Sequence, residues 1–177
     1  MTTSVTPLTP YDDAYATCER AAATLCIYSG QEHPSTVTAA LGINPTRVAL
    51  AEEASSPGTA QHKYSRKNGW FLESEGTVLS LDLRRHLDWL LEIVESCSEK
   101  ILALQALPGF RTRVSCVWWS AHGHGGPTLW PVHMQRLAAL NLELGFDIYF
   151  FGDEEGGKPK TSPELWQREP RSRRPTN

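Results

Sequence analysis

The most chemically suggestive segment of the sequence brings two histidines and two glycines together: His122, His124, Gly125 and Gly126. Imidazoles two residues apart can ligate one divalent metal ion, and His133 is a candidate third ligand. A metal ion held there would activate a water molecule, which gives the hypothesis of a small metal-dependent enzyme or sensor. The backbone N–H groups of Gly125 and Gly126 precede a predicted helix and are candidates for holding an anion. The alternative is a tight turn with solvated histidines.

No known catalytic motif accompanies this loop. The sequence contains no G-x-S-x-G, no H-E-x-x-H and no phosphate-binding G-K-[ST] signature, and no Ser, His and Asp stand in the order of a known triad. We therefore predict no catalytic residue and lean toward a protein that is not an enzyme. The only cofactor considered is the divalent metal ion of the alternative hypothesis.

Two consecutive tryptophans, Trp118 and Trp119, stand in a predicted strand. Strand alternation sends the two indoles to opposite faces of the sheet. One enters the core, and the other joins residues of the same parity on the second face: Trp119, Arg113, Tyr149, Asp147, Tyr28 and Phe71. Tyr, Trp and Arg are enriched in the hot spots of protein interfaces, so this set predicts a binding surface. The alternative is an ordinary half-exposed sheet face, or one covered by another segment.

Arg47 is a further binding candidate. It follows Pro45 and Thr46 in a predicted turn, from which a guanidinium can reach a carboxylate on a partner or ligand. A salt bridge within the chain is the alternative.

The elements that position these residues follow from the hydrophobic periodicity. Strands are predicted at 22–29, 69–73, 111–120 and 145–151, because apolar residues form short runs or alternate there. A short helix is predicted from Pro34 to Gly42, and a long one at 82–107 with Asp82 as N-cap and a kink near 96–98. A third helix starts at Pro131, with four apolar side chains turned inward: Val132, Met134, Leu137 and Leu140. Residues 49–68 are expected to form a long loop.

This order of elements predicts a single α+β domain. Its expected core is a four-stranded mixed or antiparallel sheet, with about three helices packed mainly on one face. The domain is expected to cover residues 18–152. Residues 1–17 are expected to form a flexible N-terminal arm, and residues 153–177 a disordered tail rich in Pro and Arg.

Several segments resemble successive blocks of one bacterial family, the domain of unknown function numbered 4279. The blocks are residues 24–27 (TLCI), 41–47 (LGINPTR), 68–70 (NGW), 86–91 (HLDWLL), 120–127 (SAHGHGGP) and 144–150 (LGFDIYF). The resemblance implies an α+β sheet over about residues 22–151 and a small cytoplasmic protein without an assigned activity. It brings no catalytic residues with it. This chain has Trp130 where a Ser or Thr cap would normally precede the helix at Pro131.

Composition and charge restrict the function classes further. The chain has 177 residues, a formal net charge of −3 and four cysteines. The cysteines lack metal-ligand spacing, and no apolar run is long enough to span a membrane, so we expect a cytoplasmic protein with reduced thiols. The acidic balance argues against nucleic-acid binding, except through the basic segment 158–177.

The resulting prediction is a non-enzymatic binding protein whose aromatic and charged sheet face holds another protein. An immunity or accessory protein is one form of this prediction.

Overall fold

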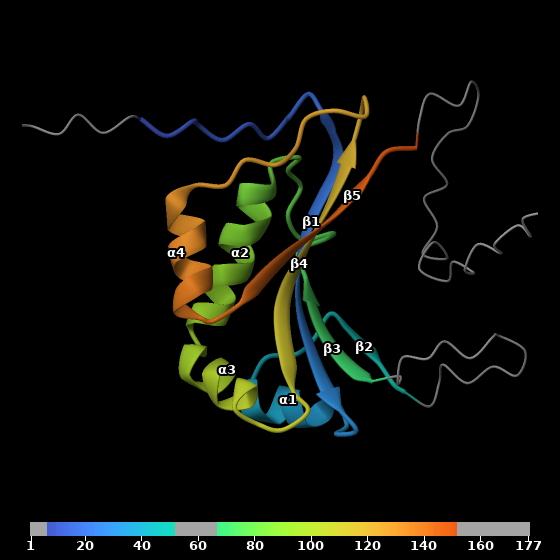
Figure 1. Ribbon diagram of the computed structural model, residues 1–177, viewed down its shortest axis with the longest axis vertical. Coiled ribbons are helices and arrows are strands. Elements are labelled where there is room, and N and C mark those ends of the chain that lie inside the picture. Colours follow the sequence, from blue (N-terminus) through green and yellow to red (C-terminus); the bar gives the residue numbers. More distant parts are fainter. Residues whose placement is uncertain (1–6, 52–66, 152–177) are drawn as a thin grey trace, which may run out of the picture.

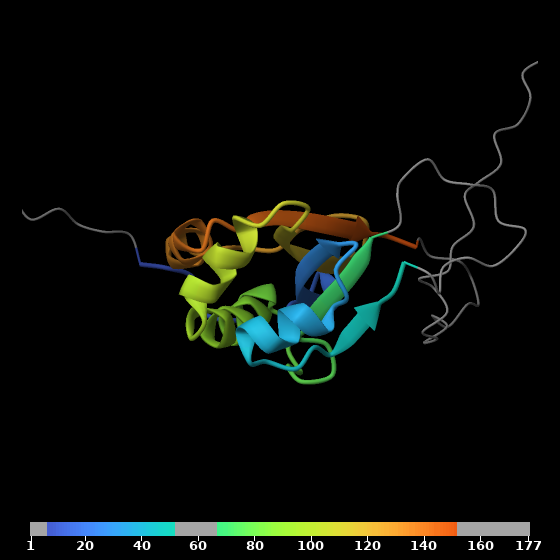
Figure 2. The same ribbon diagram turned by 90° about the horizontal axis from the view of Figure 1, so that it is seen from below.

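The computed structural model describes residues 7–51 and 67–151. The tail expected at 153–177 and most of the loop expected at 49–68 lie outside the described residues. The described part of the chain contains one sheet, with a layer of helices on one side (Figure 1; Figure 2). The elements, in chain order, are β1 (Cys18–Gly30), α1 (Ser35–Leu41), β2 (Arg47–Ala49), β3 (Asn68–Glu73), α2 (Leu83–Glu95), α3 (Ser98–Gln105), β4 (Arg111–Ser120), α4 (Pro131–Ala139) and β5 (Glu143–Tyr149).

The sheet is mixed, which is one of the two arrangements that the sequence left open, and its described part has five strands and not the four expected. Their order is β2-β3-β1-β4-β5, with the long strand β1 in the centre. β1 pairs antiparallel with β3 and β4, whereas β5 lies parallel to β4 because α4 carries the chain back between them. The missed strand, β2, has three residues and pairs antiparallel with β3. Three residues are too few to show an alternation, so this strand falls inside the segment predicted as turn and loop.

The helix count was also wrong, since the described residues form four helices and not about three. The single helix expected at 82–107 is divided into α2 and α3, and the break falls at Ser96 and Cys97, where a kink was predicted. Both side chains bond to carbonyls of the preceding turn: Ser96 Oγ donates to Ile93 O at 2.6 Å, and Cys97 Sγ donates to Val94 O at 3.3 Å. Side-chain bonds of this kind compete with the helical backbone pattern.

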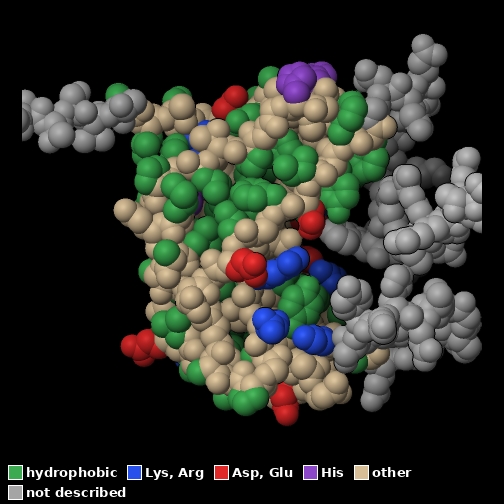
Figure 3. Space-filling model, viewed as in Figure 1, with side chains coloured by type: hydrophobic (Ala, Val, Ile, Leu, Met, Phe, Trp, Pro, Cys, Tyr) green, Lys and Arg blue, Asp and Glu red, His purple; other side chains and the backbone are tan. Residues whose placement is uncertain are grey.

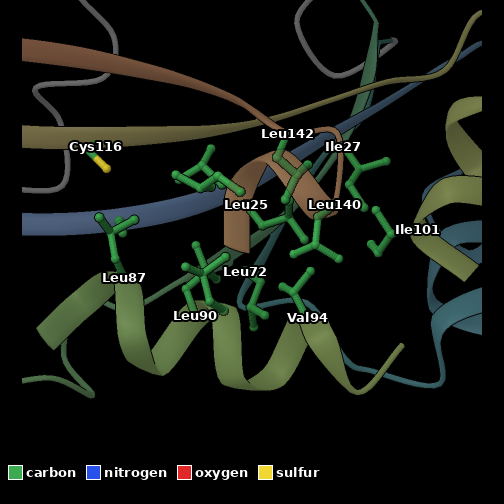
Figure 4. Close-up of a cluster of buried hydrophobic side chains, with 14 of the residues drawn as sticks. Leu25, Ile27, Leu72, Leu87, Leu90, Val94, Ile101, Cys116, Leu140 and Leu142 are labelled. Atoms are coloured by element: carbon green, nitrogen blue, oxygen red, sulfur yellow. The ribbon is translucent and has the colours of Figure 1, made fainter. Parts of the chain in front are cut away.

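The hydrophobic core lies between the sheet and the helix layer (Figure 4). β1, β3 and β4 supply alternate residues to it, and α2 supplies the apolar stripe that the sequence predicted. The side chains labelled in the close-up that lie on these elements are Leu25, Ile27, Leu72, Leu87, Leu90, Val94 and Cys116. All four cysteines of the chain are buried free thiols. No helix in the described residues is both long and apolar enough to cross a membrane.

Residues 7–17, expected as part of a flexible arm, are held against the helix layer by polar contacts. Arg84 on α2 is buried, and its guanidinium donates to the carbonyl oxygens of Thr9 and Pro10 at 3.0 and 2.7 Å. Asp82 pairs with Arg84 and accepts the backbone N–H of Asp12 at 2.8 Å. This segment is therefore part of the folded domain.

Candidate functional site

The histidine loop links β4 to α4, and its two histidines come together at the surface. His122 and His124 are exposed, with ring centroids 5.8 Å apart. Gly123 and Gly125 have φ angles of 73° and 86°, where L side chains are strained. A Cβ at Gly123 would lie 3.0 Å from the Phe150 ring, and one at Gly125 would lie 2.6 Å from Thr17 Oγ1. The packing of the loop against Phe150 and the N-terminal segment therefore requires these glycines.

His133, the candidate third metal ligand, does not join the pair. It is fully buried, and both of its ring nitrogens have partners: Nδ1 accepts the backbone N–H of Trp130 at 3.1 Å, and Nε2 donates to Asp88 Oδ1 at 3.1 Å. Within residues 7–51 and 67–151, no group of three or more His, Cys, Asp or Glu side chains is arranged to hold a metal ion. The geometry thus leaves His122 and His124 as a two-ligand pair.

The anion site expected at Gly125 and Gly126 lacks the helix that it needs. The helix begins only at Pro131, which has no N–H. The Gly126 carbonyl oxygen is the acceptor for Tyr15 Oη at 3.1 Å, so this residue ties the loop to the N-terminal segment. The helix dipole that would favour an anion is therefore not directed at these two glycines.

His133 helps to fix the start of α4, where the sequence lacks a Ser or Thr cap at Trp130. The imidazole accepts the backbone N–H of Trp130, which is the role of the Glu or Gln at the third helical position of a capping box. His133, Leu137 and Leu140 face inward, whereas Val132 and Met134, predicted to be inward, are exposed. The prediction is therefore confirmed for Leu137 and Leu140 and wrong for Val132 and Met134, whose place in the first turn is taken by His133.

The carboxylate of Asp88 joins three elements in this polar cluster. It accepts from Tyr11 Oη, from His133 Nε2 and from Arg136 Nη1 at 2.9 Å, and Arg136 also pairs with Glu95. Burial, together with the hydrogen bond to Asp88, raises the pKa of Tyr11 to about 12, so its hydroxyl stays a donor. The cluster holds the N-terminal segment, α2 and α4 together.

A second buried histidine, His86, lies under the turn after β3. Its Nδ1 is 2.8 Å from Ser74 Oγ, which itself accepts the N–H of Ala23, and its Nε2 donates to Ser80 O at 2.8 Å. Ser74 and His86 are both buried, so this serine–histidine pair is closed to a substrate and acts as a structural link. Burial lowers the pKa of His86 and also of His133 below the ordinary value of 6.5.

We expect the stability of the protein to fall as the pH is lowered from 7 to 5. Both buried histidines have a lowered pKa in the folded state, so below about pH 6.5 the unfolded chain binds protons that the folded chain does not. The two histidines give their full stabilisation above the pKa that they have in the unfolded chain. Below that pKa, each of them lowers the free energy of unfolding by up to about 1.4 kcal/mol for each pH unit. Urea unfolding at steps between pH 8 and pH 5 measures this slope.

The control for this prediction is the double variant His122→Gln/His124→Gln, which changes only exposed imidazoles. It should keep the same slope. A free energy of unfolding that does not change between pH 7 and pH 5 would contradict the role of the two buried histidines.

The second face of the sheet carries the predicted aromatic and charged set, and we call it the open face. The strand register places these side chains on it: Arg20, Tyr28, Arg47, Phe71, Arg111, Arg113, Trp119, Asp147 and Tyr149. The core residues Val114, Cys116 and Trp118 point to the opposite side, as alternation predicted. In the described part of the chain, all four helices lie on the core side (Figure 2).

One end of the open face is an aromatic cluster. Trp119 lies edge-on to Tyr149 and Phe151, with ring centroids 6.3 and 4.9 Å apart. The Arg20 guanidinium lies 4.8 Å from the centroid of the Trp119 ring and pairs with Glu75. These contacts hold the rings in place while leaving Tyr149 and Phe151 exposed. We call Trp119, Tyr149 and Phe151 the aromatic cluster.

At the other end, Arg47 has found partners within the chain. Its Nε and Nη2 donate to Glu73 Oε1 at 3.0 and 2.8 Å, and its guanidinium lies 3.9 Å from the centroid of the Phe71 ring. The alternative of an internal salt bridge therefore describes this residue. Arg47 covers Phe71, which is buried although it lies on the open face.

Two arginines of β4 differ from Arg47 in this respect. Arg111 and Arg113 are exposed, and no carboxylate in residues 7–51 and 67–151 pairs with either of them. Asp147 is also exposed and accepts a hydrogen bond from Ser115 Oγ at 3.3 Å. The open face thus combines an aromatic cluster with cations that have no described ion-pair partner.

Sequence reasoning missed three residues of the open face, Arg20, Arg111 and Phe151. It also missed the buried Arg84, which holds the N-terminal segment. A signal existed for each. Extending the alternation back from residue 22 places Arg20 on the face of Trp119, and Arg111 and Phe151 share the parity of Arg113 and Tyr149. Arg84 stands three and seven residues before Leu87 and Leu91, on the apolar stripe of α2.

Together, the fold and the site define a one-sheet α+β protein with helices on one face and an aromatic, cationic surface on the other. A family model described as "Domain of unknown function (DUF4279)" matches residues 17–151. The chain therefore belongs to this family, as the ordered sequence blocks predicted, and the match spans all five described strands. Comparison with curated proteins and with solved structures gave no match.

Proposed function

We propose that the protein is a non-enzymatic binding protein that holds another protein on its open face. The observation that carries the proposal is the aromatic cluster, which stands partly exposed on a sheet face that no described helix covers. Large rigid aromatic side chains supply contact area at low cost in conformational entropy, and they dominate the energetics of interfaces. A cytoplasmic location is part of this proposal, because four free thiols suit a reducing compartment.

The charges of the open face indicate the chemistry of the partner. Arg113 and Arg111 lie on β4 six and eight residues before Trp119, toward the end of the open face that holds Phe71, and present guanidinium groups to solvent. Guanidinium groups pair with carboxylates in fixed, charge-assisted geometry. The partner surface that fits best carries an apolar anchor for the aromatic cluster and an acidic side chain for Arg113. An immunity or accessory role toward such a protein is one form of this function.

The test is affinity capture from a lysate of the native host, with captured proteins quantified by mass spectrometry. The double variant Trp119→Ala/Arg113→Ala should reduce capture of the specific partner more than tenfold, while circular dichroism shows an unchanged fold. The matched control is Leu102→Ala, which removes an exposed apolar side chain from α3 on the helix side. Equal capture by the double variant and the wild-type protein would overturn the proposal.

The alternative, a metal- or anion-dependent enzyme or sensor at the histidine loop, rests on one observation, the close approach of the two exposed imidazoles. It has less support, because His133 is engaged elsewhere. Native mass spectrometry of protein purified without chelator separates the two functions. One metal ion per chain that is lost in His122→Ala/His124→Ala would favour the alternative. The basic segment 158–177, considered for nucleic acid, lies outside the described residues.

A further inference from the structure

The two edges of the sheet are unequal. β2 forms one edge with three residues, whereas β5 forms the other with seven. An edge strand presents unpaired backbone N–H and C=O groups, and natural proteins shorten, charge or cover such strands to prevent association. β2 is short and carries Arg47. β5 is long and carries two charged residues, Glu143 at its start and Asp147, and from Ile148 to Phe151 the chain has none.

Large side chains of β5 and of the two residues that follow it are exposed on both faces of the sheet. The exposed fractions are 41% for Phe146, 60% for Ile148, 37% for Tyr149, 50% for Phe150 and 45% for Phe151. Phe146 and Ile148 point to the same side of the sheet as the core residues Cys116 and Trp118, but the helix layer does not extend over them. β5 lies at the near side of the view in Figure 1, and in the same view hydrophobic side chains gather over the middle and upper part of the surface (Figure 3).

The exposed apolar side chains that the aromatic cluster does not use supply a large part of the area that a specific interface requires. With large side chains of about 150–250 Å² each, the exposed fractions of Phe146, Ile148 and Phe150 correspond to ~300 Å² per copy. Two copies would bury ~600 Å² from these three side chains alone, against a minimum of about 1,000 Å² for a specific interface. The backbone edge and the neighbouring exposed side chains of α4, Val132 and Met134, add to this area.

We propose that β5 pairs antiparallel with β5 of a second copy of this chain, so that the two sheets form one continuous sheet. A two-fold axis makes such an interface self-complementary, because each residue i that contacts j is matched by j contacting i. The modest net charge of −3 gives little repulsion between copies.

The side-chain pattern of β5 fixes the register, with the axis at Ile148. Phe146 then lies opposite Phe150 of the second copy, Asp147 lies opposite Tyr149, and Gly145 lies opposite Phe151. Directly opposed aromatic side chains stabilise a strand pair. An axis at Asp147 would set two carboxylates against each other, and an axis at Tyr149 would leave Phe146 outside the paired residues that the structure describes.

The first experiment measures the mass of the full chain in solution by sedimentation equilibrium at about 100 µM. The wild-type protein should be a dimer. Ile148→Lys should be a folded monomer, because it places two ammonium groups on the axis. The matched control Leu102→Lys, at an exposed apolar position of α3, should remain a dimer. A monomeric wild-type protein, or an Ile148→Lys variant that dimerises equally well, would overturn the proposal and leave the edge to a different occupant.

The second experiment tests the register by oxidative cross-linking. The four native cysteines are buried, so a cysteine introduced on β5 is the exposed thiol. Ile148→Cys should form an intermolecular disulfide rapidly, since directly opposed Cβ atoms lie within ~5.5 Å, whereas Tyr149→Cys thiols would be diagonal at ~7–8 Å. Equal or reversed rates would overturn the register. The double variant Trp119→Ala/Arg113→Ala should remain dimeric although it loses capture of the partner. The dimer proposal and the proposed binding function can therefore fail independently of each other.

Discussion

Replacing Arg84 with alanine is expected to lower the free energy of unfolding by about 3–5 kcal/mol. Arg84 and Asp82 are both almost completely buried, and the five N–H donors of the guanidinium are all used. The guanidinium also lies against two aromatic rings, 4.6 Å from the centroid of Trp130 and 5.3 Å from that of Tyr11. Removing it leaves the Asp82 carboxylate as a buried charge without its partner.

The loss should extend beyond the ion pair. The guanidinium connects α2 to residues 9 and 10, and Asp82 caps α2 by accepting the N–H of Arg84 at 3.0 Å. The N-terminal segment should therefore become susceptible to proteolysis before the rest of the domain unfolds. Chemical denaturation followed by circular dichroism gives the change in unfolding free energy, and limited trypsin digestion gives the local effect.

The adjacent residue supplies a matched control. Arg85 pairs with Asp13 at 3.2 Å, but both side chains are about half exposed. An exposed pair contributes about 0.2–1 kcal/mol, so Arg85→Ala should change stability by less than 1 kcal/mol. Similar losses in Arg84→Ala and Arg85→Ala would show that the buried pair has no special role.

The second large effect is expected from the two adjacent tryptophans, which should respond very differently to the same substitution. Trp118 is fully buried and packs edge-on against Tyr15, with ring centroids 5.0 Å apart. Its replacement by alanine leaves a cavity in the core and should cost about 3–5 kcal/mol. Trp119→Ala loses edge contacts and one cation–π contact on the open face, and should cost about 1–2 kcal/mol.

Parallel thermal and urea unfolding of the two variants tests this difference. Trp118→Ala should shift the urea midpoint strongly, while Trp119→Ala stays folded well enough for the binding experiment. A larger loss in Trp119→Ala than in Trp118→Ala would contradict the assignment of the two sheet faces. It would also remove the basis for treating the aromatic cluster as a surface.

Much of the fold could be predicted from local patterns. Alternation in β4 separated Trp118 from Trp119, and the three- and four-residue spacing of leucines identified the stripe of α2. Asp82 was predicted as N-cap and does accept the N–H of Arg84. The ordered sequence blocks predicted the family to which the chain belongs. These features depend on neighbours in sequence, so the sequence carries them directly.

The candidate site was predictable only in part. The strand parities placed Trp119, Arg113, Asp147 and Tyr149 on one face, and the register shows them there. The pairing of Arg47 with Glu73 depends on the short strand β2, which no periodicity revealed. The proposed third ligand, His133, was assigned by nearness in sequence, but its contacts come from α2 and from the start of its own helix.

What the sequence determined by itself is therefore four of the five described strands and their two sides, the apolar stripe of α2, and the family. Periodicity and turn chemistry act over a few residues, and they are sufficient for these features. The tertiary structure decided which polar groups meet: Arg84 with residues 9 and 10, Asp88 with Tyr11 and His133. It also decided that β5 lies at an edge with its apolar side chains exposed. Burial and partnership depend on contacts between distant segments, and only the packed chain brings those segments together.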